Sequence, residues 1–297
     1  MARSASTPSW FDRLTEGYPG MTDPIFIERN GHRTWLKWHR GRRRLSDPVF
    51  TGARILEAMR LGASVEVDLV VTSDKGMAVL HDLTLDRETT GQGPVAAAGD
   101  AMIRELRLRG NNGAPIADKV MLLDDLCALM AAGSVHPDAL LQLDYKEDET
   151  VLDPEAIAKF ARATGPVARN MIVSSGSAAA VKLLTGAVPG MRSGFDPSDE
   201  ARFKAAMAGG TLQGFVDDAV AALDGTDLIY LYWEIVTTSA EAGFDMVAAF
   251  HKHGKRIDAW TIREASAATK PVVERLLELR VDQITTDDPE GLLALMG

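Results

Sequence analysis

The stretch Ser64-Val-Glu-Val-Asp-Leu-Val-Val-Thr72 decides the fold, because it is an apolar, β-branched run interrupted by only two carboxylates. Such a run predicts a buried strand. The stretch before it, residues 52–61, is rich in Ala and Leu and predicts a helix. Outward from this pair, strand-like and helical stretches alternate along most of the chain. Strict alternation predicts parallel strands that are joined by helical crossovers.

The alternation comprises eight strands and eight helices from residue 33 onward. We expect the strands at residues 34–38, 65–72, 140–145, 171–174, 191–195, 228–233, 257–262 and 283–286. We expect the helices at residues 52–61, 123–132, 154–163, 177–184, 199–208, 239–253, 270–279 and 289–296. Eight such units in about 260 residues predict an α/β fold of the (β/α)8 TIM-barrel type, with an open doubly wound sheet as the alternative.

Two segments do not follow this alternation of strands and helices. Residues 1–32 show little periodicity, so we interpret them as an N-terminal extension that packs on the barrel through Trp10, Phe11 and Phe26. Residues 33–297 are then a single TIM-barrel domain. An insertion after the second strand, residues 77–109, adds a short strand and a glycine-rich turn.

Composition narrows the class of protein. The net charge of −10 over 297 residues argues against a dedicated nucleic-acid binder. The N-terminus lacks the apolar core of a secretory signal, and the chain has no apolar run long enough to span a membrane. The single cysteine, Cys127, lies in an apolar helical stretch and cannot form an internal disulfide. We therefore expect a cytoplasmic protein whose oligomeric state the sequence leaves open.

TIM-barrel enzymes place their chemistry at the C-terminal ends of the strands, so polar residues there are the candidates. Glu66 and Asp68 stand two apart in one strand and therefore point to the same face. Two like charges in an apolar strand repel each other, and a divalent cation relieves that repulsion. Carboxylate oxygens favour Mg²⁺ or Ca²⁺, with Mn²⁺ as a further candidate. A salt-bridged pair at a strand end is the alternative.

The next predicted strand repeats this arrangement with opposite charges. Asp144 and Lys146 share a face in Leu140-Leu-Gln-Leu-Asp-Tyr-Lys146. Asp144 is a candidate third metal ligand, and Lys146 a candidate for neutralising a phosphate oxygen. A plain Asp–Lys ion pair is the alternative.

Two histidines each follow an apolar run. His39 ends the first strand, and His81 ends the short strand of the insertion. Imidazole titrates near neutrality, so these side chains are candidates for proton transfer. Arg40, next to His39, has the geometry to bind a phosphate with two parallel hydrogen bonds. A structural, hydrogen-bonded histidine is the alternative at either position.

At these residues the chain resembles the glycerophosphodiester phosphodiesterase family, over about residues 34–296. The elements that carry the resemblance are His39-Arg-Gly41, Gly62–Thr72, Val79-Leu-His-Asp82, Leu85–Gly91, Asp144-Tyr-Lys146, Ala259-Trp-Thr-Ile262 and Ile284–Pro289. Each is weak alone, and their order and spacing are specific.

The resemblance implies a barrel enzyme that hydrolyses a small phosphodiester to a phosphomonoester and an alcohol, directly or through a cyclic phosphate. It assigns acid–base catalysis to His39 and His81 and the metal to Glu66, Asp68 and Asp144. Arg40 and Lys146 are expected to bind the phosphate, and Trp260 is expected to line the substrate pocket. The expected substrate is a glycerophosphodiester or a related sugar or polyol phosphodiester.

Two positions depart from the family pattern. The Glu-Asn-Thr that usually follows His-Arg-Gly is replaced here by Asp47-Pro-Val-Phe-Thr51, and the third metal ligand is Asp144 where the family usually has Glu. These features are similar to sphingomyelinase D-like phospholipases, whose reaction would stop at a cyclic phosphate. Those enzymes lack the stretch seen here at residues 81–93. A barrel that binds a phosphorylated ligand without turnover is the remaining alternative. The arginines at residues 42–44 form either a solvated turn or a clamp for the substrate.

Overall fold

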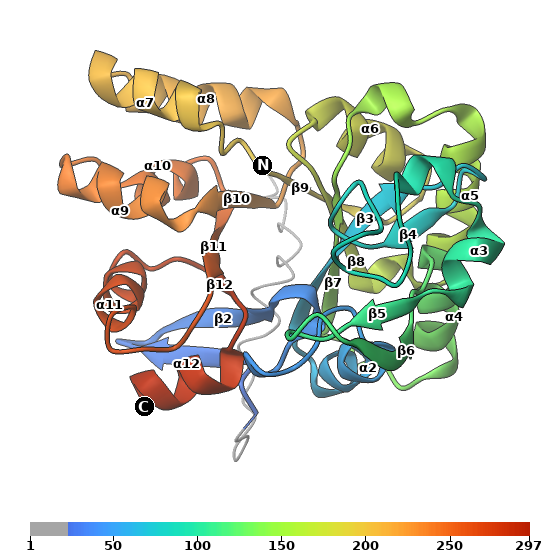
Figure 1. Ribbon diagram of the computed structural model, residues 1–297. Helices are drawn as coiled ribbons and strands as arrows, with labels where there is room; N and C mark the ends of the chain where they lie inside the picture. The colour runs from blue at the N-terminus through green and yellow to red at the C-terminus, as the bar shows by residue number, and fades with distance from the viewer. Residues whose placement is uncertain (1–22) are drawn as a thin grey trace, which may run out of the picture.

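The computed structural model describes residues 23–297 and shows a closed barrel of eight parallel strands (Figure 1). The strands, in barrel order, are β2 (His32–Trp38), β3 (Ser64–Val71), β7 (Leu140–Tyr145), β8 (Met171–Ser174), β9 (Arg192–Phe195), β10 (Leu228–Tyr232), β11 (Arg256–Ile262) and β12 (Gln283–Thr286). Parallel pairing of β12 with β2 closes the barrel. The TIM-barrel prediction is confirmed, and every expected strand lies within two residues of its observed bounds.

Helices surround the barrel (Figure 1). They are α2 (Gly52–Leu61), α4 (Leu123–Ala132), α5 (Pro154–Thr164), α6 (Ala178–Gly186), α7 (Glu200–Gly209), α8 (Leu212–Ala222), α9 (Trp233–Glu241), α10 (Met246–His251), α11 (Lys270–Glu278) and α12 (Pro289–Met296). Cys127 is buried in α4, as the sequence indicates.

The sequence-based expectation was wrong in the region between β9 and β11. The single helix expected at residues 239–253 is two helices, α9 and α10, and α8 was not expected. Gly243, with φ of 83°, ends the first of the two, and the Asp245 side chain accepts a hydrogen bond from Ala248 N to begin the second. Helix α9 also begins at Trp233, inside the expected strand. A left-handed glycine followed by an N-capping aspartate interrupts the helix despite its continuous apolar pattern.

The described part of the N-terminal segment lies against the barrel. Strand β1 (Phe26–Arg29) pairs with β2 in antiparallel orientation. The rings of Phe26 and Trp35 pack edge to face, with centroids 5.6 Å apart. Trp10 and Phe11 lie outside the described residues, so the assignment of residues 1–32 to one packed extension stays a prediction.

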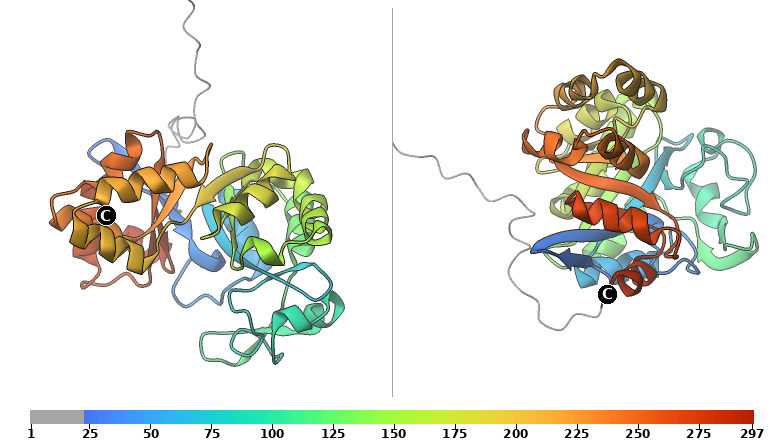
Figure 2. Two further views of the ribbon diagram at one scale, coloured as in Figure 1. Left: turned by 90° about the horizontal axis from the view of Figure 1, so that it is seen from above. Right: turned by 90° about the vertical axis from the view of Figure 1, so that its left-hand side faces the viewer.

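The insertion after β3 is longer than expected. Strand β4 (Met77–Val79) pairs with β3 in antiparallel orientation, and α3 (Asp100–Glu105) and the hairpin of β5 (Arg107–Arg109) and β6 (Pro115–Lys119) follow. It projects from one side of the barrel (Figure 2). His81 lies in the first loop of this insertion, directly after β4. The insertion therefore brings one of the two expected histidines to the barrel mouth.

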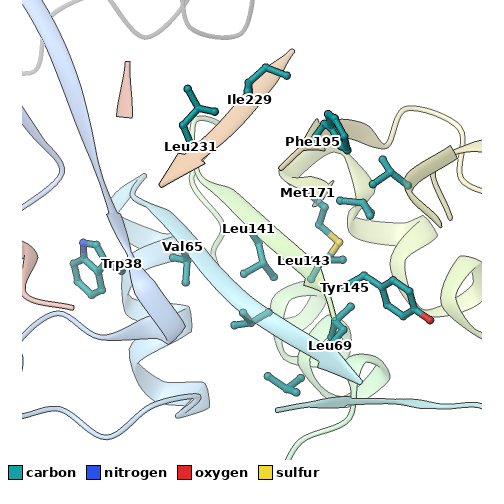
Figure 3. Packing of buried hydrophobic residues seen from close by; sticks show 14 of the residues in the cluster. Trp38, Val65, Leu69, Leu141, Leu143, Tyr145, Met171, Phe195, Ile229 and Leu231 are labelled. Atoms are coloured by element: carbon teal, nitrogen blue, oxygen red, sulfur yellow. The ribbon is translucent and has the colours of Figure 1, made fainter. Parts of the chain in front are cut away.

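Alternating side chains divide the strands between two environments. Val65, Val67 and Leu69 of β3 belong to the large apolar cluster between strands and helices, part of which Figure 3 shows. The other face of the strands lines the barrel interior, where Leu140, Ile172, Leu228 and Tyr230 form a small separate cluster. Polar side chains follow on this inner face toward the C-terminal strand ends. The polar groups of β3 and β7 therefore lie at the C-terminal side of this apolar cluster inside the barrel.

No helix within residues 23–297 is long and apolar enough to cross a membrane. The assignment to the cytoplasm stays a prediction.

Candidate active site

Three carboxylates from two neighbouring strands meet at the barrel mouth. Asp68 of β3 and Asp144 of β7 are register partners, and Glu66 lies two residues before Asp68. Oxygen atoms of all three lie within 4.8 Å of one another. Burial raises the pKa of Glu66 well above its usual range, and the nearby charge of Asp68 raises it further. The cluster therefore holds more negative charge than its buried setting tolerates.

Two cations compensate part of this charge. Lys146 Nζ lies 2.7 Å from Asp68 Oδ1 and 2.5 Å from Asp144 Oδ2, and Arg40 Nε lies 3.0 Å from Asp68 Oδ2. Although burial opposes the change, Lys146 and Arg40 lower the pKa of Asp68 to about 2. Within residues 23–297, Glu66 has an ion-pair contact only with His39 Nε2, at 3.8 Å. The Glu66 carboxylate also accepts a 2.9 Å hydrogen bond from the backbone N–H of Arg40. Three converging carboxylates, one of them without an ion pair to a lysine or arginine side chain of the described residues, fit a divalent cation with oxygen ligands.

His39 is oriented by a carboxylate from the last barrel strand. It follows β2 directly, and its Nδ1 lies 2.7 Å from Asp287 Oδ1, just beyond β12. Burial lowers the pKa of His39, and the contact with Asp287 only partly opposes this. The neutral imidazole is therefore favoured near neutral pH, with Nδ1 facing Asp287 and Nε2 facing Glu66.

His81 has the same kind of partner. Its Nδ1 lies 2.9 Å from Asp82 Oδ1, and its backbone N–H donates to Glu88 Oε2 at 2.9 Å. Asp82 is in turn held by Arg87, whose hydrogen bonds lower the pKa of Asp82 to about 2. His81, Asp82 and Glu88 also have the spacing of a metal site. Because Arg87 and Arg40 pair with these carboxylates, we interpret the cluster as a device that orients His81.

One cavity of about 170 Å³ collects these groups. It is lined by His39, Arg40, Glu66, His81, Gln142, Asp144, Lys146, Asp196, Tyr230, Trp260, Thr261, Arg263 and Thr285. The structure thus brings seven of the expected site residues to one cavity, and the eighth, Asp68, contacts two of them from below. The arrangement can hold a phosphate among cations while two imidazoles exchange protons with it.

Comparison with known proteins identifies the family of this chain. A model of the "Glycerophosphoryl diester phosphodiesterase family" matches residues 39–291. The chain belongs to this family. It is therefore a phosphodiesterase enzyme.

A curated glycerophosphodiester phosphodiesterase from Caldanaerobacter subterraneus is 26% identical over 270 residues, which cover 89% of this chain and 98% of the relative. Solved structures share the fold. A glycerophosphodiester phosphodiesterase from Thermotoga maritima has a TM-score of 0.61 at 19% identity, covering 89% of this chain and 99% of that one. A phosphodiesterase from Oleispira antarctica, in complex with the product sn-glycerol-3-phosphate, has a TM-score of 0.61 at 16% identity, covering 88% and 96%.

The arginines that follow His39 in this phosphodiesterase are largely occupied by protein carboxylates. Arg43 contacts Asp23, Glu57 and Glu290, and Arg44 contacts Glu290 at 2.6 Å. Arg42 Nη1 lies 3.3 Å from Asp287 Oδ1. The arginines at residues 43 and 44 therefore tie the loop to α2 and α12, and they do not line the cavity.

The loop that replaces the family's Glu-Asn-Thr is built around a buried aromatic ring. Phe50 is 1% exposed, has a positive φ of 60°, and donates its backbone N–H to Arg40 O at 2.8 Å. Asp47 accepts hydrogen bonds from the backbone N–H groups of Arg43 and Arg44. The loop thus supports the backbone of Arg40 and of the arginines at residues 43 and 44.

Sequence reasoning missed several residues of this site. Asp287 and Asp82 orient the histidines, although both stand inside elements that carry the resemblance. Asp196, Tyr230 and Arg263 line the cavity from β9–β11. Burial raises the pKa of Asp196 to about 7. These three residues lie near the C-terminal ends of predicted strands, as Asp144 does, and this position in the sequence could have identified them as candidates.

Proposed function

We propose that this enzyme hydrolyses a glycerophosphodiester, or a related sugar or polyol phosphodiester, to a phosphomonoester and an alcohol. His39 and His81 act as the acid–base pair, and Glu66, Asp68 and Asp144 hold one divalent metal ion. One observation carries the proposal: two histidines, each with a carboxylate on Nδ1, line a cavity together with Glu66 and Asp144, and the Asp68 carboxylate converges with these two.

The carboxylates on Nδ1 fix which histidine nitrogen takes part in the reaction. Asp287 and Asp82 each accept a hydrogen bond from the Nδ1–H of their histidine, so Nε2 of each ring is left to exchange a proton with the substrate. The lowered pKa of His39 favours its neutral form and hence its role as the base that activates the attacking hydroxyl. His81 then protonates the leaving alkoxide. The attacking hydroxyl belongs either to water or to the substrate, in which case a cyclic phosphate forms first.

Arg40 and Lys146 bind the phosphate. Their charged groups already lie at the carboxylate cluster, 3.0 and 2.7 Å from Asp68. They can donate hydrogen bonds to the non-bridging oxygens, where negative charge develops in the transition state. A divalent ion, when bound to the three carboxylates, supplies additional charge for the same oxygens, and Mg²⁺, Ca²⁺ and Mn²⁺ all suit oxygen ligands. Trp260 lines the same cavity and contacts an alcohol group.

The test is hydrolysis of glycerophosphocholine and of bis-p-nitrophenyl phosphate with EDTA, and again with Mg²⁺, Ca²⁺ or Mn²⁺ restored. We expect metal-dependent release of the phosphomonoester. His39→Ala and His81→Ala should each lower kcat by about 10² to 10⁴ without unfolding the protein. Near-wild-type turnover in both variants would overturn the assignment of the acid–base pair.

The lyase alternative shares this site and differs only in the product. It is favoured by Asp144 in place of a glutamate and by the rebuilt 47–51 loop. Phosphorus NMR of the product separates the two, because a lyase accumulates a cyclic phosphate and a hydrolase a phosphomonoester.

A further inference from the structure

The two halves of the barrel mouth carry different chemistry. Strands β2, β3 and β7 and the insertion supply both histidines and the three carboxylates. The opposite half, β9–β11, supplies Asp196, Tyr230, Trp260 and Arg263 to the same cavity. A phosphodiester held at the first half must therefore direct one of its two alcohol groups toward the second.

Tyr230 presents a buried donor to this second half. Its side chain is 2% exposed, and its hydroxyl has no hydrogen-bond partner among residues 23–297. Burial and the nearby carboxylates, Asp258 first among them, raise the pKa of Tyr230 well above its usual range. The phenol therefore stays protonated and can donate. A buried donor that lacks an acceptor is unfavourable, and a substrate oxygen in the cavity would satisfy it.

Trp260 adds a second donor of the same kind. Its indole Nε1 is buried and, in the described part of the chain, has no acceptor. An indole nitrogen can only donate, so it too calls for an oxygen on the ligand. The two side chains therefore predict a partner with several acceptor oxygens.

Arg263 gives this half its positive charge, beside the carboxyl group of Asp196. It is exposed, lines the cavity, and has no ion pair with any carboxylate of the described chain. The other two cations of the cavity, Arg40 and Lys146, are both paired with the carboxylate cluster. A guanidinium that lines the same cavity as two unpaired donors fits a carboxylate or a phosphate, which accept two parallel hydrogen bonds from arginine.

We propose that the β9–β11 half of the cavity selects phosphodiesters whose alcohol group carries a second negative charge. Arg263 binds this charge, and Tyr230 and Trp260 donate hydrogen bonds to the oxygens of the alcohol group. The inference rests on the proposed function and adds the substrate class to it. A trimethylammonium group is the contrasting case. It could stack on the paired rings of Trp260 and Tyr232, whose centroids lie 5.3 Å apart, but Arg263 would repel it.

The experiment compares kcat/KM for four esters of glycerol phosphate with the metal-loaded enzyme. Their alcohol groups are glycerol, which is neutral, choline, which is cationic, and two anionic groups, 3-hydroxypropanoate and a second glycerophosphate unit. We expect at least one anionic ester to exceed the neutral ester by about tenfold, and the choline ester to fall below both. Which anionic ester is faster tells whether the second charge is a carboxylate or a phosphate.

Arg263→Gln then tests the residue itself. The preference for the anionic over the neutral ester should fall by about tenfold, mainly through KM. Arg275→Gln, a change at an exposed arginine of α11 outside the cavity, should leave the preference intact. No preference in the wild type, the same preference in Arg263→Gln, or fastest cleavage of the choline ester would each overturn the inference while the proposed function stands. If no ester is cleaved with any metal, the proposed function itself fails and the inference falls with it.

Discussion

Ser174 Oγ donates a 2.6 Å hydrogen bond to Asp144 Oδ1, while Lys146 Nζ lies 2.5 Å from the other oxygen of the same carboxylate. Ser174 accepts in turn from Gln142 Nε2 at 2.8 Å, and Gln142 Oε1 accepts from Lys37. Both oxygens of the proposed third metal ligand are therefore fixed, and one of them is held from inside the barrel.

This contact predicts that Ser174→Ala weakens metal binding. Partners that hold a ligating carboxylate typically contribute 10–100-fold in metal affinity, so we expect a loss of about that size. Calorimetric titration with Mn²⁺ or Ca²⁺ measures the dissociation constant without reference to activity. Ser175→Ala is the matched control, because the hydroxyl of Ser175 contacts the backbone of Ser177 and not Asp144. Equal affinities in the two variants would show that the serine does not position Asp144.

The series of hydrogen bonds from Asp144 through Ser174 and Gln142 ends at Lys37, which forms a buried ion pair. This ion pair predicts an effect on the stability of the fold. Lys37 Nζ lies 2.7 Å from Asp258 Oδ2, and both side chains are fully buried. Lys37→Met removes one partner and, among residues 23–297, leaves the Asp258 carboxylate with only the hydroxyl of Thr285 as a hydrogen-bond donor. We expect the free energy of unfolding to fall by about 3–5 kcal/mol, as when other buried pairs are broken.

Replacing both partners should be less harmful than replacing one. The double variant Lys37→Met with Asp258→Leu contains no uncompensated charge, so we expect it to recover most of the loss in urea unfolding. A double variant that is no more stable than Lys37→Met would mean that the pair does not account for the loss.

The contact between His39 and Asp287 predicts a kinetic effect with little structural change. Asp287→Asn keeps the size of the side chain but no longer selects the Nδ1-protonated form of His39, so kcat should fall by about 10² to 10⁴. Steady-state kinetics with a metal-loaded variant checks this. Asp288→Asn is the control, because Asp288 caps α12 through Gly291 N and asparagine caps equally well. If both variants lose the same activity, the effect belongs to the helix end and not to His39.

The sequence predicted the half of the site that lies within single strands. The spacing of two residues between Glu66 and Asp68, and between Asp144 and Lys146, is a local pattern that a strand converts directly into a shared face. His39 and His81 follow apolar runs, which is also local. The barrel then brings these residues together, because adjacent parallel strands end at the same edge.

The other half depends on closure of the barrel and was therefore not predictable from local pattern. Asp287 reaches His39 across 248 positions of sequence, and its neighbour Asp288 has the ordinary role of a helix cap. In the sequence Lys37 and Asp258 are isolated polar residues of apolar strands. They meet only because the closed barrel places β2 and β11 on either side of β12. Tyr230 belongs to an aromatic run that predicts only a strand.

Asp282, at the opposite end of β12 from the active site, predicts a dependence of stability on pH. Its Oδ1 lies 2.8 Å from Arg256 Nη1, and its Oδ2 lies 2.8 Å from His251 Nε2 and accepts from Ile257 N. Burial opposes ionisation, yet these contacts hold the pKa of Asp282 below its usual value. Below about pH 5, unfolded chains therefore take up a proton that the folded protein does not, so the stabilisation by Asp282 is lost as pH falls.

Asp282→Asn should remove that part of the acid sensitivity. Near neutral pH the variant should be less stable than the wild type by about 1–3 kcal/mol, because a charged acceptor of several hydrogen bonds is lost. The difference should shrink as the pH is lowered below the usual pKa of an aspartate, because the wild type then progressively loses the stabilisation by its ionised carboxylate. Urea unfolding at a series of pH values measures both curves. A constant difference across the whole range would show that the loss comes from packing or hydrogen bonding alone and not from the charge of Asp282.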